Sequence, residues 1–250
     1  MPVDLLLLSN SMNHGQPMYA HAAQVFSEVA GDDPVVFVPY ALADWDEYGD
    51  RVAASFAAFD VHATSAHRAA DPARAILEAR VVMMGGGNTF RLLDSLIGLG
   101  VIAPLATNVR EGSTRYLGAS AGTNVACPTI RTTNDMPICQ PSSFDALDLI
   151  PFQINLHYLD VDPTSTYMGE SREERIDEFL EENDCPVLAL YEGSWLRVSG
   201  AQARVTGASR LFDRGGVDLF DDGLDASHLL RVAPEFDGGV RPADGASTPA

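Results

Sequence analysis

The fold of this chain can be worked out from one sharp turn, Leu117-Gly118-Ala119-Ser120-Ala121-Gly122. The residues before it, 114–117, have the composition of a short strand, and residues 121–127 predict a helix that ends before Pro128. A serine at such a strand-to-helix turn is exposed, and the helix points its first backbone N–H groups toward it. The turn makes Ser120 a candidate nucleophile, although for Gly-x-Ser-x-Gly alone a tightly packed turn without chemistry is the more frequent explanation.

The segments on both sides of this turn predict an α/β fold. Continuous apolar strands alternate with amphipathic helices, which is typical of a parallel sheet covered on both faces. The expected strands are Val3–Leu8, Val35–Val38, Val61–Ala63, Val81–Met84, Phe152–His157 and Val187–Tyr191, and the expected helices are Tyr19–Val29, Trp45–Phe59, Pro72–Ala79, Phe90–Gly98 and Ser171–Asn183. We therefore predict a three-layer sandwich with a mostly parallel sheet, followed by a terminal antiparallel hairpin between Trp195 and Phe220.

Length and composition favour a single folded unit. The chain has 250 residues, and its apolar content of 46% is enough for one large core. We expect one domain over residues 1–233. Residues 234–250 are rich in Gly, Pro, Ala and Asp and have too little apolar surface to fold, so a disordered tail is predicted there.

The charge of the chain limits its partners. A net charge of −19 argues against binding to nucleic acid or to an anionic membrane surface, because no basic stripe is present to displace counterions. All sixteen basic residues are arginine, which excludes Ser-Lys and Schiff-base mechanisms. The apolar run Leu5–Leu8 is short and lacks a basic region before it, so neither a signal peptide nor a membrane span is expected.

The three cysteines indicate a reducing environment. Cys127, Cys139 and Cys185 are odd in number and include no Cys-x-x-Cys pair, so neither a disulfide framework nor a thiolate zinc site is suggested. We expect a cytoplasmic protein that uses no metal and no other cofactor.

In a doubly wound sheet the chemistry lies at the carboxyl ends of the strands, and a glycine loop follows one of them. Met84 is followed by Gly85-Gly86-Gly87-Asn88, whose spacing fits neither phosphate-binding motif. The backbone N–H of Gly86 or Gly87 could instead join that of Ala121 around a developing oxyanion. A tight strand-to-helix connection explains the loop alone equally well.

Two further strand ends carry groups that a serine nucleophile needs. His157 ends one expected strand and Glu192 directly follows another, so the two could form a Ser-His-Glu relay with Ser120. Asp135 is the competing acid, because it lies between Ser120 and His157 as the acid does in α/β-hydrolases. The remaining histidines are expected to be solvated: His14, His21, His62, His67 and His228.

Several motifs together resemble the peptidase E family of serine peptidases, which also contains cyanophycinase. They are Met84–Phe90, Gly118–Ala126, Pro128–Ile138, Gln153–His157 and Gly169–Ile176. The resemblance implies a cytoplasmic enzyme with a flavodoxin-like or class I glutamine amidotransferase-like sandwich that cleaves dipeptides carrying an N-terminal aspartate. It also implies a Ser-His-Glu triad, which maps onto Ser120, His157 and Glu192.

Recognition of a small peptide with an aspartate side chain poses a problem for a strongly acidic protein. A local, desolvated guanidinium must supply the attraction, and Arg131 and Arg172 are the candidates, although each also fits a surface arginine. The free α-amino group needs an anion, which Asp135 or Glu170 could provide. That use of Asp135 would leave Glu192 as the triad acid.

Alternatives to this function follow from departures within the motifs. Leu156 stands where the family usually has proline, Ser171 stands where threonine is frequent, and residues 158–168, expected over the pocket, differ from the family pattern. A cyanophycinase-like or isoaspartyl peptidase would share the nucleophile, but its segment after the histidine should be rich in arginine, whereas residues 158–162 are acidic. A sandwich that only binds a small molecule would keep the fold without the chemistry. The sequence is compatible with a monomer or a homodimer.

Overall fold

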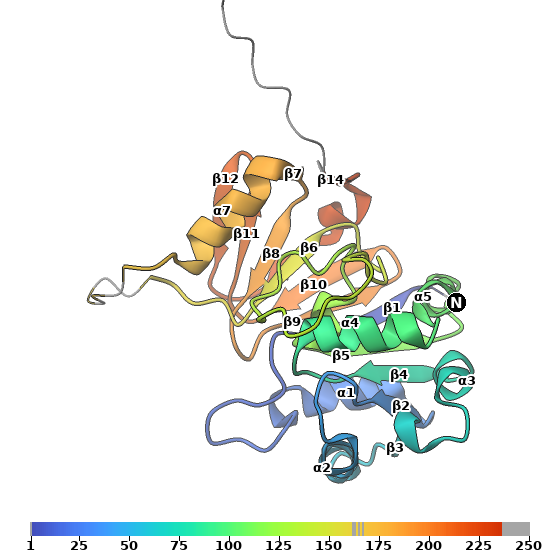
Figure 1. Ribbon diagram of the computed structural model, residues 1–250. Helices are drawn as coiled ribbons and strands as arrows, with labels where there is room; N and C mark the ends of the chain where they lie inside the picture. The colour runs from blue at the N-terminus through green and yellow to red at the C-terminus, as the bar shows by residue number, and fades with distance from the viewer. Residues whose placement is uncertain (1, 162–163, 165, 167, 237–250) are drawn as a thin grey trace, which may run out of the picture.

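The computed structural model describes residues 2–161, 164, 166 and 168–236, and its largest element is an eight-stranded sheet (Figure 1). Its strands are β1 Asp4–Leu8, β2 Val35–Val38, β3 Ala63–Ser65, β4 Val81–Met84, β5 Arg115–Ala119, β9 Trp195–Ser199, β10 Gln202–Thr206 and β13 Leu224–Asp225. Neighbours in the order β1-β5-β4-β2-β3 are parallel. Beyond β1, the strands β9, β10 and β13 continue the sheet with antiparallel pairing. The predicted mostly parallel sheet is confirmed.

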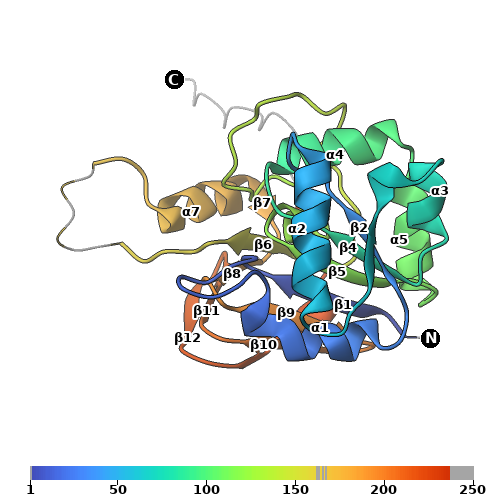
Figure 2. The same cartoon turned by 90° about the horizontal axis from the view of Figure 1, so that it is seen from below.

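Helices cover both faces of this sheet, and Figure 2 shows them on its two sides. They are α1 Ala23–Ala30, α2 Trp45–Ala57, α3 Pro72–Leu77, α4 Thr89–Gly98 and α5 Ile102–Arg110. Successive residues of a strand point to opposite faces. Leu6 and Leu8 accordingly join one core cluster, to which α1 and α2 contribute, whereas Leu5 and Leu7 join the cluster of α3, α4 and α5. The three-layer sandwich is therefore confirmed.

Helix α5 is absent from the prediction, and several ends are shifted. Pro104 makes the start of α5 resemble a loop, but proline is tolerated in a first helical turn, where its missing N–H has no intrahelical partner. The helix predicted from Tyr19 begins later, because Tyr19 has a positive φ of 61°, which is not helical. A 3₁₀ turn lies between Tyr19 and α1. Short helical segments are η1 Ala20–Ala22, η2 Ala66–Arg68, α6 Ala121–Asn124 and η3 Ser227–Arg231.

A second, four-stranded sheet lies beside the first and carries α7 (Arg172–Glu182). Its strands are β6 Gln153–Leu156, β8 Val187–Leu190, β11 Ser209–Asp213 and β12 Gly216–Phe220. Ile176 and Leu180 of α7 pack on Val187, Ala189 and Phe212 of this sheet. The strands expected over 152–157 and 187–191 therefore belong to a separate sheet, which places the ends of two sheets at one site.

The antiparallel hairpin predicted between Trp195 and Phe220 is present, and the same segment forms a second hairpin that lies in the other sheet. β9 and β10 pair with each other in the large sheet, whereas β11 and β12 pair in the small one. The alternation of apolar and polar residues indicates strands but does not specify a partner distant in sequence.

The structure describes only the first three residues of the tail predicted from residue 234. Glu235–Phe236 form strand β14, which pairs with β7 (Asn183–Asp184) after α7. Regular structure thus continues through Phe236, and residues 237–250 of the predicted tail lie outside the described residues.

Within the described part of the chain, no single helix combines the length and the apolar composition needed to cross a membrane. The bent pair α4 and α5 meets those criteria only when joined, and its two helices are 95° apart.

The cysteines provide a first test of this packing. Cys127 and Cys185 are fully buried, and burial raises the pKa of both thiols, that of Cys185 to about 12. Cys139 is only partly buried. Since the thiolate is the reactive form, native protein at pH 8 should react rapidly with about one equivalent of Ellman's reagent, and unfolded protein with about three. Rapid reaction of two or three thiols in the native protein would contradict the packing described.

Candidate active site

The turn at Ser120 has the strained geometry expected of an exposed nucleophile. β5 ends at Ala119, α6 begins at Ala121, and Ser120 between them has φ 52° and ψ −116°. A positive φ is costly for a residue with a side chain and persists only where the surroundings impose it. Gly122 permits the turn, because a Cβ there would lie 2.1 Å from the carbonyl oxygen of Met84. The predicted strand-turn-helix around Ser120 is confirmed.

The small sheet brings a histidine and a carboxylate to this serine. His157 follows β6, and its Nε2 lies 2.9 Å from the Oγ of Ser120. Glu192 lies in the turn after β8, and its Oε1 is 3.2 Å from the Nδ1 of the same imidazole. The His157 and Glu192 side chains are 37% and 59% exposed, so the array opens to solvent and is accessible to a substrate.

Asp135, the competing acid, is engaged elsewhere. Its Oδ2 accepts hydrogen bonds from the backbone N–H of Thr89 at 2.7 Å and from the Thr89 hydroxyl at 2.6 Å. Thr89 is the first residue of α4, so the carboxylate of Asp135 satisfies an N–H group that the helix cannot pair internally. In this geometry Glu192, and not Asp135, is hydrogen-bonded to His157.

The three candidate oxyanion donors lie in the glycine loop and in the turn at Ser120. Gly86 packs against the serine, since a Cβ there would lie 3.2 Å from the Cβ of Ser120. Tyr48 lies beside this glycine: burial raises the pKa of Tyr48, and the Gly86 backbone acts in the opposite direction. Within the described ranges, the N–H groups of Gly87 and Ala121 donate to no backbone or side-chain acceptor.

The two candidate arginines lie in different places. The Nη1 of Arg131 donates to Asn183 at 3.1 Å, and its guanidinium lies over the ring of Phe236, 5.6 Å from the centroid. These partners form the β7–β14 pair, near the beginning of β6 and away from the strand end that carries His157. The structure thus does not bring Arg131 to the site that the sequence predicted for it.

Arg172, by contrast, is partly buried at the start of α7 and has no carboxylate within ion-pair distance among the residues described. Burial lowers its pKa, Arg175 lowers it further, and the charge of Asp135 raises it. Arg172 and Asp135 are therefore electrostatic neighbours. Glu170 is paired with Arg175, whose Nε lies 3.4 Å from its carboxylate, so it is a weaker candidate for the substrate's amino group.

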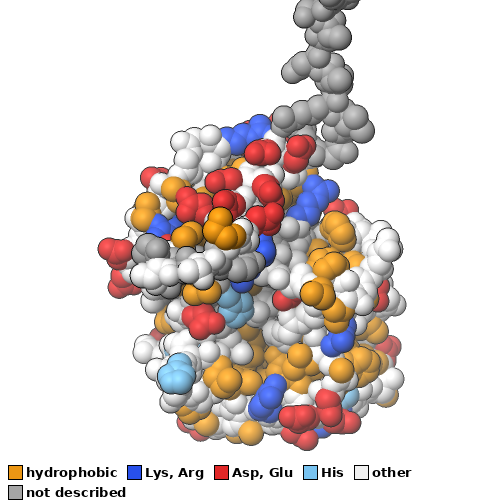
Figure 3. All heavy atoms as spheres, turned by 60° about the vertical axis from the view of Figure 1, so that its left-hand side comes forward, with side chains coloured by type: hydrophobic (Ala, Val, Ile, Leu, Met, Phe, Trp, Pro, Cys, Tyr) orange, Lys and Arg blue, Asp and Glu red, His pale blue; other side chains and the backbone are white. Residues whose placement is uncertain are grey.

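The setting of Arg172 matters because its surroundings are acidic. On the face shown in Figure 3, acidic side chains gather over α7, above a hollow between the two parts of the molecule. A desolvated guanidinium at this place would offer an acidic ligand a local positive charge beside an acidic surface.

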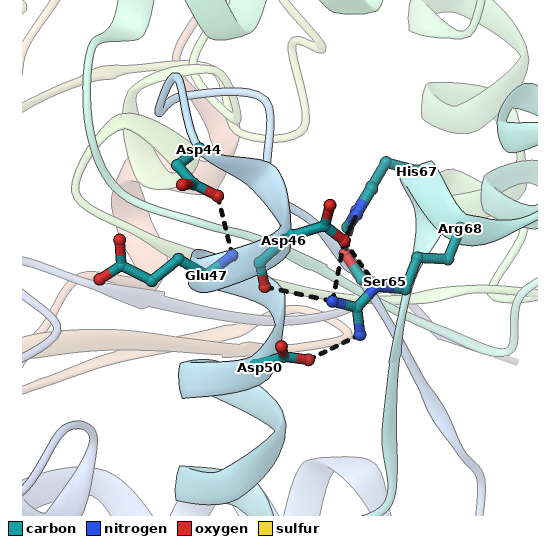
Figure 4. Close-up of polar contacts among 7 residues, drawn as sticks. All are labelled: Asp44, Asp46, Glu47, Asp50, Ser65, His67 and Arg68. Carbon is teal, nitrogen blue, oxygen red and sulfur yellow. Dashed lines mark hydrogen bonds and ion pairs between the residues drawn. The ribbon is translucent and has the colours of Figure 1, made fainter.

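The chain contains a second Ser-His-Asp array, at the β3 edge of the large sheet (Figure 4). The Oγ of Ser65 lies 2.8 Å from the Nδ1 of His67, whose Nε2 lies 3.1 Å from Asp46. Arg68 also binds Asp46, at 2.9 Å. A Cβ on Gly49 would lie 3.1 Å from the Ser65 Oγ, so α2 covers this hydroxyl and the array is structural.

The other histidines agree only in part with the prediction that they are solvated. His14, His62 and His228 are exposed. The side chain of His67 is only 11% exposed because it bridges η2 to α2. Both ring nitrogens of His21 are buried without a partner in the described part of the chain, and burial lowers the pKa of this residue. Helical and polar surroundings in sequence do not reveal such tertiary burial.

Sequence reasoning missed two residues next to the site, Ser9 and Asn10. Both are buried and directly follow β1, and the Ser9 hydroxyl accepts a hydrogen bond from the backbone N–H of His157. The rule that polar residues at strand ends are functional candidates would have identified them.

A mostly parallel α/β sandwich with a serine at a strand-to-helix turn, a histidine beside it and a carboxylate behind the histidine has the architecture of a serine hydrolase. Among the described residues, no cluster of side chains suitable for a metal ion is present. The model of peptidase family S51 matches residues 5–206, and the chain belongs to this family of serine peptidases.

Known proteins agree with this membership. Peptidase E of Streptomyces coelicolor is 51% identical over 243 residues, which cover 96% of this chain and 100% of that protein. Peptidase E of Salmonella typhimurium is 46% identical over 209 residues, or 82% of this chain and 90% of the relative. The crystal structure of a peptidase from an acI-B1 Actinobacterium superposes with a TM-score of 0.61 at 14% identity, covering 90% of this chain and 97% of that one. The last likeness confirms the fold, which is of the class I glutamine amidotransferase type.

Proposed function

We propose that this peptidase hydrolyses dipeptides with an N-terminal aspartate, with Ser120 as nucleophile, His157 as general base and Glu192 as the acid that orients the histidine. The observation that carries the proposal is the position of one imidazole between two partners, 2.9 Å from the serine hydroxyl and 3.2 Å from the glutamate. The names of the relatives, peptidase E, support the same activity.

The proposed reaction proceeds in two halves. In the first, the Oγ of Ser120 attacks the peptide carbonyl carbon, its proton passes to the Nε2 of His157, and the same proton then goes to the leaving amine. In the second, water attacks the acyl ester, gives its proton to His157, and aspartate leaves as Ser120 recovers a proton. Glu192 accepts the Nδ1–H of His157, which leaves Nε2 free to act as base and stabilises the imidazolium.

The oxyanion of each tetrahedral intermediate would be bound by backbone N–H groups. Ala121 supplies one, at the positive end of the short helix α6, and Gly86 or Gly87 supplies the second from the loop that packs against Ser120. Hydrogen bonds that are already oriented toward the developing charge lower the barrier without reorganisation.

We infer that Arg172 binds the substrate's aspartate side chain and that Asp135 provides negative charge for its α-amino group. The partial burial of the guanidinium and its nearness to Asp135 support this assignment. A dipeptide is then held at both charged groups of its first residue, and its carbonyl is presented to Ser120.

Replacing Arg172 with methionine tests this assignment. A charge-assisted hydrogen bond is worth about 1.5–3 kcal/mol, so kcat/KM for Asp-Leu should fall about 10- to 100-fold, with much less change for an uncharged Leu-Leu analogue. Arg131→Met is the matched control, because Arg131 contacts Asn183 and Phe236 instead. It should lower the thermal midpoint and leave the preference for Asp-Leu unchanged; equal losses with both dipeptides in Arg172→Met would refute a direct contact.

The other properties we propose follow from composition and from the site. The thiols of all three cysteines are free, which suits a cytoplasmic enzyme, and the net charge of −19 disfavours nucleic acid as a partner. The proposed site takes its residues from one chain, so a monomer would be active, and a homodimer would contain two independent sites.

A further inference from the structure

We infer that the end of β1 is a template for the catalytic array, in which Ser9 and Asn10 act as positioning residues for His157 and Glu192. This inference rests on the proposed function and adds residues to it. Three consecutive residues, Leu8, Ser9 and Asn10, each contact the backbone at or next to one member of the proposed triad.

The first contact holds the nucleophile. The carbonyl oxygen of Leu8 accepts the backbone N–H of Ser120 at 3.1 Å and the hydroxyl of Thr123 at 2.8 Å. Leu8 is the last residue of β1, which lies beside β5 in the large sheet. The strained turn at Ser120 is thus fixed to the neighbouring strand.

The second contact joins the two sheets. Ser9 is fully buried, and its Oγ accepts the backbone N–H of His157 at 3.0 Å while donating to the carbonyl oxygen of Leu190 at 3.0 Å. This uses the donor of the hydroxyl and one of its acceptor positions. His157 needs such restraint, because its φ of 52° is unfavourable for a residue with a side chain.

The third contact holds the turn of the acid. The Oδ1 of Asn10 accepts the backbone N–H of Gly193 at 2.7 Å, directly after Glu192. The Nδ2 of Asn10 donates to Asn13 at 2.8 Å and to the carbonyl of Met12 at 2.9 Å, which fixes the amide orientation. Asn10 is 3% exposed, so water does not compete freely for these bonds.

These contacts fix the distance between catalytic residues that come from two different sheets. Ser120 belongs to the large sheet, whereas His157 and Glu192 follow strands of the small sheet, so their separation depends on how the sheets are joined. β1 is a central strand of the large sheet, and its end contacts both parts. Loss of the Ser9 hydroxyl would free the backbone of His157 to relax, and a misplacement of about 1 Å can cost about 100-fold in rate.

The test is Ser9→Ala, compared with Thr114→Val. The control removes another buried hydroxyl that donates to a backbone carbonyl, that of Ala79 at 2.8 Å, at the opposite end of the large sheet. For Ser9→Ala we expect kcat for Asp-Leu to fall about 10- to 100-fold with KM changed by less than about threefold. The rate at which a fluorophosphonate labels Ser120 should fall in proportion. Thr114→Val should lose similar thermal stability and keep both rates.

A second variant keeps the test decisive if Ser9→Ala does not fold. Asn10→Ala removes the acceptor of the Gly193 N–H. A lower kcat and a lower labelling rate in Asn10→Ala, with KM changed by less than about threefold, would support the template.

The inference is overturned if Ser9→Ala matches Thr114→Val in both kcat and labelling rate while Ser120→Ala is inactive. If Ser9→Ala does not fold, the same comparison is made with Asn10→Ala. Such a result leaves the proposed function intact. Labelling needs no peptide substrate. Suppose that the wild-type protein does not cleave Asp-Leu but that Ser9→Ala still lowers the rate at which Ser120 is labelled. This result would refute the proposed substrate and support the template.

Discussion

Replacement of Ser120 with alanine is expected to lower kcat/KM for Asp-Leu by about 1,000-fold or more, because the hydroxyl that forms the acyl-enzyme is removed. The substitution should leave the fold unchanged, since Ser120 makes its structural contacts through the backbone: its N–H to Leu8, its carbonyl to Thr123 and Asn124. The measurement is steady-state hydrolysis followed by release of leucine, with the thermal midpoint as a check on folding.

Ser65→Ala is the matched control for this prediction. It removes the serine of the other Ser-His-Asp array, which is covered by α2 and bridged to Asp46 through His67 (Figure 4). We expect it to reduce stability without reducing kcat. Full activity of Ser120→Ala would refute the proposed nucleophile. Loss of activity in Ser65→Ala at unchanged stability would show that the Ser65 array, which we interpret as structural, takes part in catalysis.

The second large effect is expected for Glu192→Gln, which should lower kcat on the order of 100- to 1,000-fold with little change in KM. A neutral amide can no longer stabilise the imidazolium and can favour the wrong tautomer of His157. The loss should be smaller than for a fully buried acid, because the Glu192 side chain is 59% exposed and water can replace part of its effect.

Asp135→Asn separates the two candidate acids. Asp135 accepts two hydrogen bonds from Thr89 at the start of α4 and is an electrostatic neighbour of Arg172. Its replacement should therefore raise KM for Asp-Leu and lower stability more than it lowers kcat. If Asp135→Asn abolished turnover at unchanged KM and Glu192→Gln did not, the carboxylate behind His157 would be misassigned.

Local sequence features predicted the parts of the site that depend on local geometry. The turn at Ser120 needs small neighbours, and the apolar strands before it and before His157 are continuous, so the pattern identified both positions as candidates. Glu192 could be identified as a candidate for the same reason, but its distance from His157 depends on how β6 and β8 pair, which is not local.

The features that the sequence did not predict share a physical origin in long-range pairing. Arg131 is near Asn183 because β7 and β14 pair across a separation that no sequence periodicity encodes. The division of the terminal strands between two sheets has the same cause. Arg172 and Glu170 are close in sequence, yet only the structure shows that the carboxylate of Glu170 is paired with Arg175, whereas the guanidinium of Arg172 has no carboxylate at ion-pair distance among the described residues.

The central claim, an aspartyl dipeptidase built on Ser120, is tested most directly by kcat/KM of the wild-type protein for Asp-Leu, Glu-Leu, β-Asp-Leu and Leu-Leu under one set of conditions. We predict that Asp-Leu is preferred over each of the others by at least about tenfold, because one methylene or a displaced carboxylate misaligns the substrate against Arg172 and Ser120. Equal or faster cleavage of β-Asp-Leu, or no cleavage of Asp-Leu at all, would contradict the account.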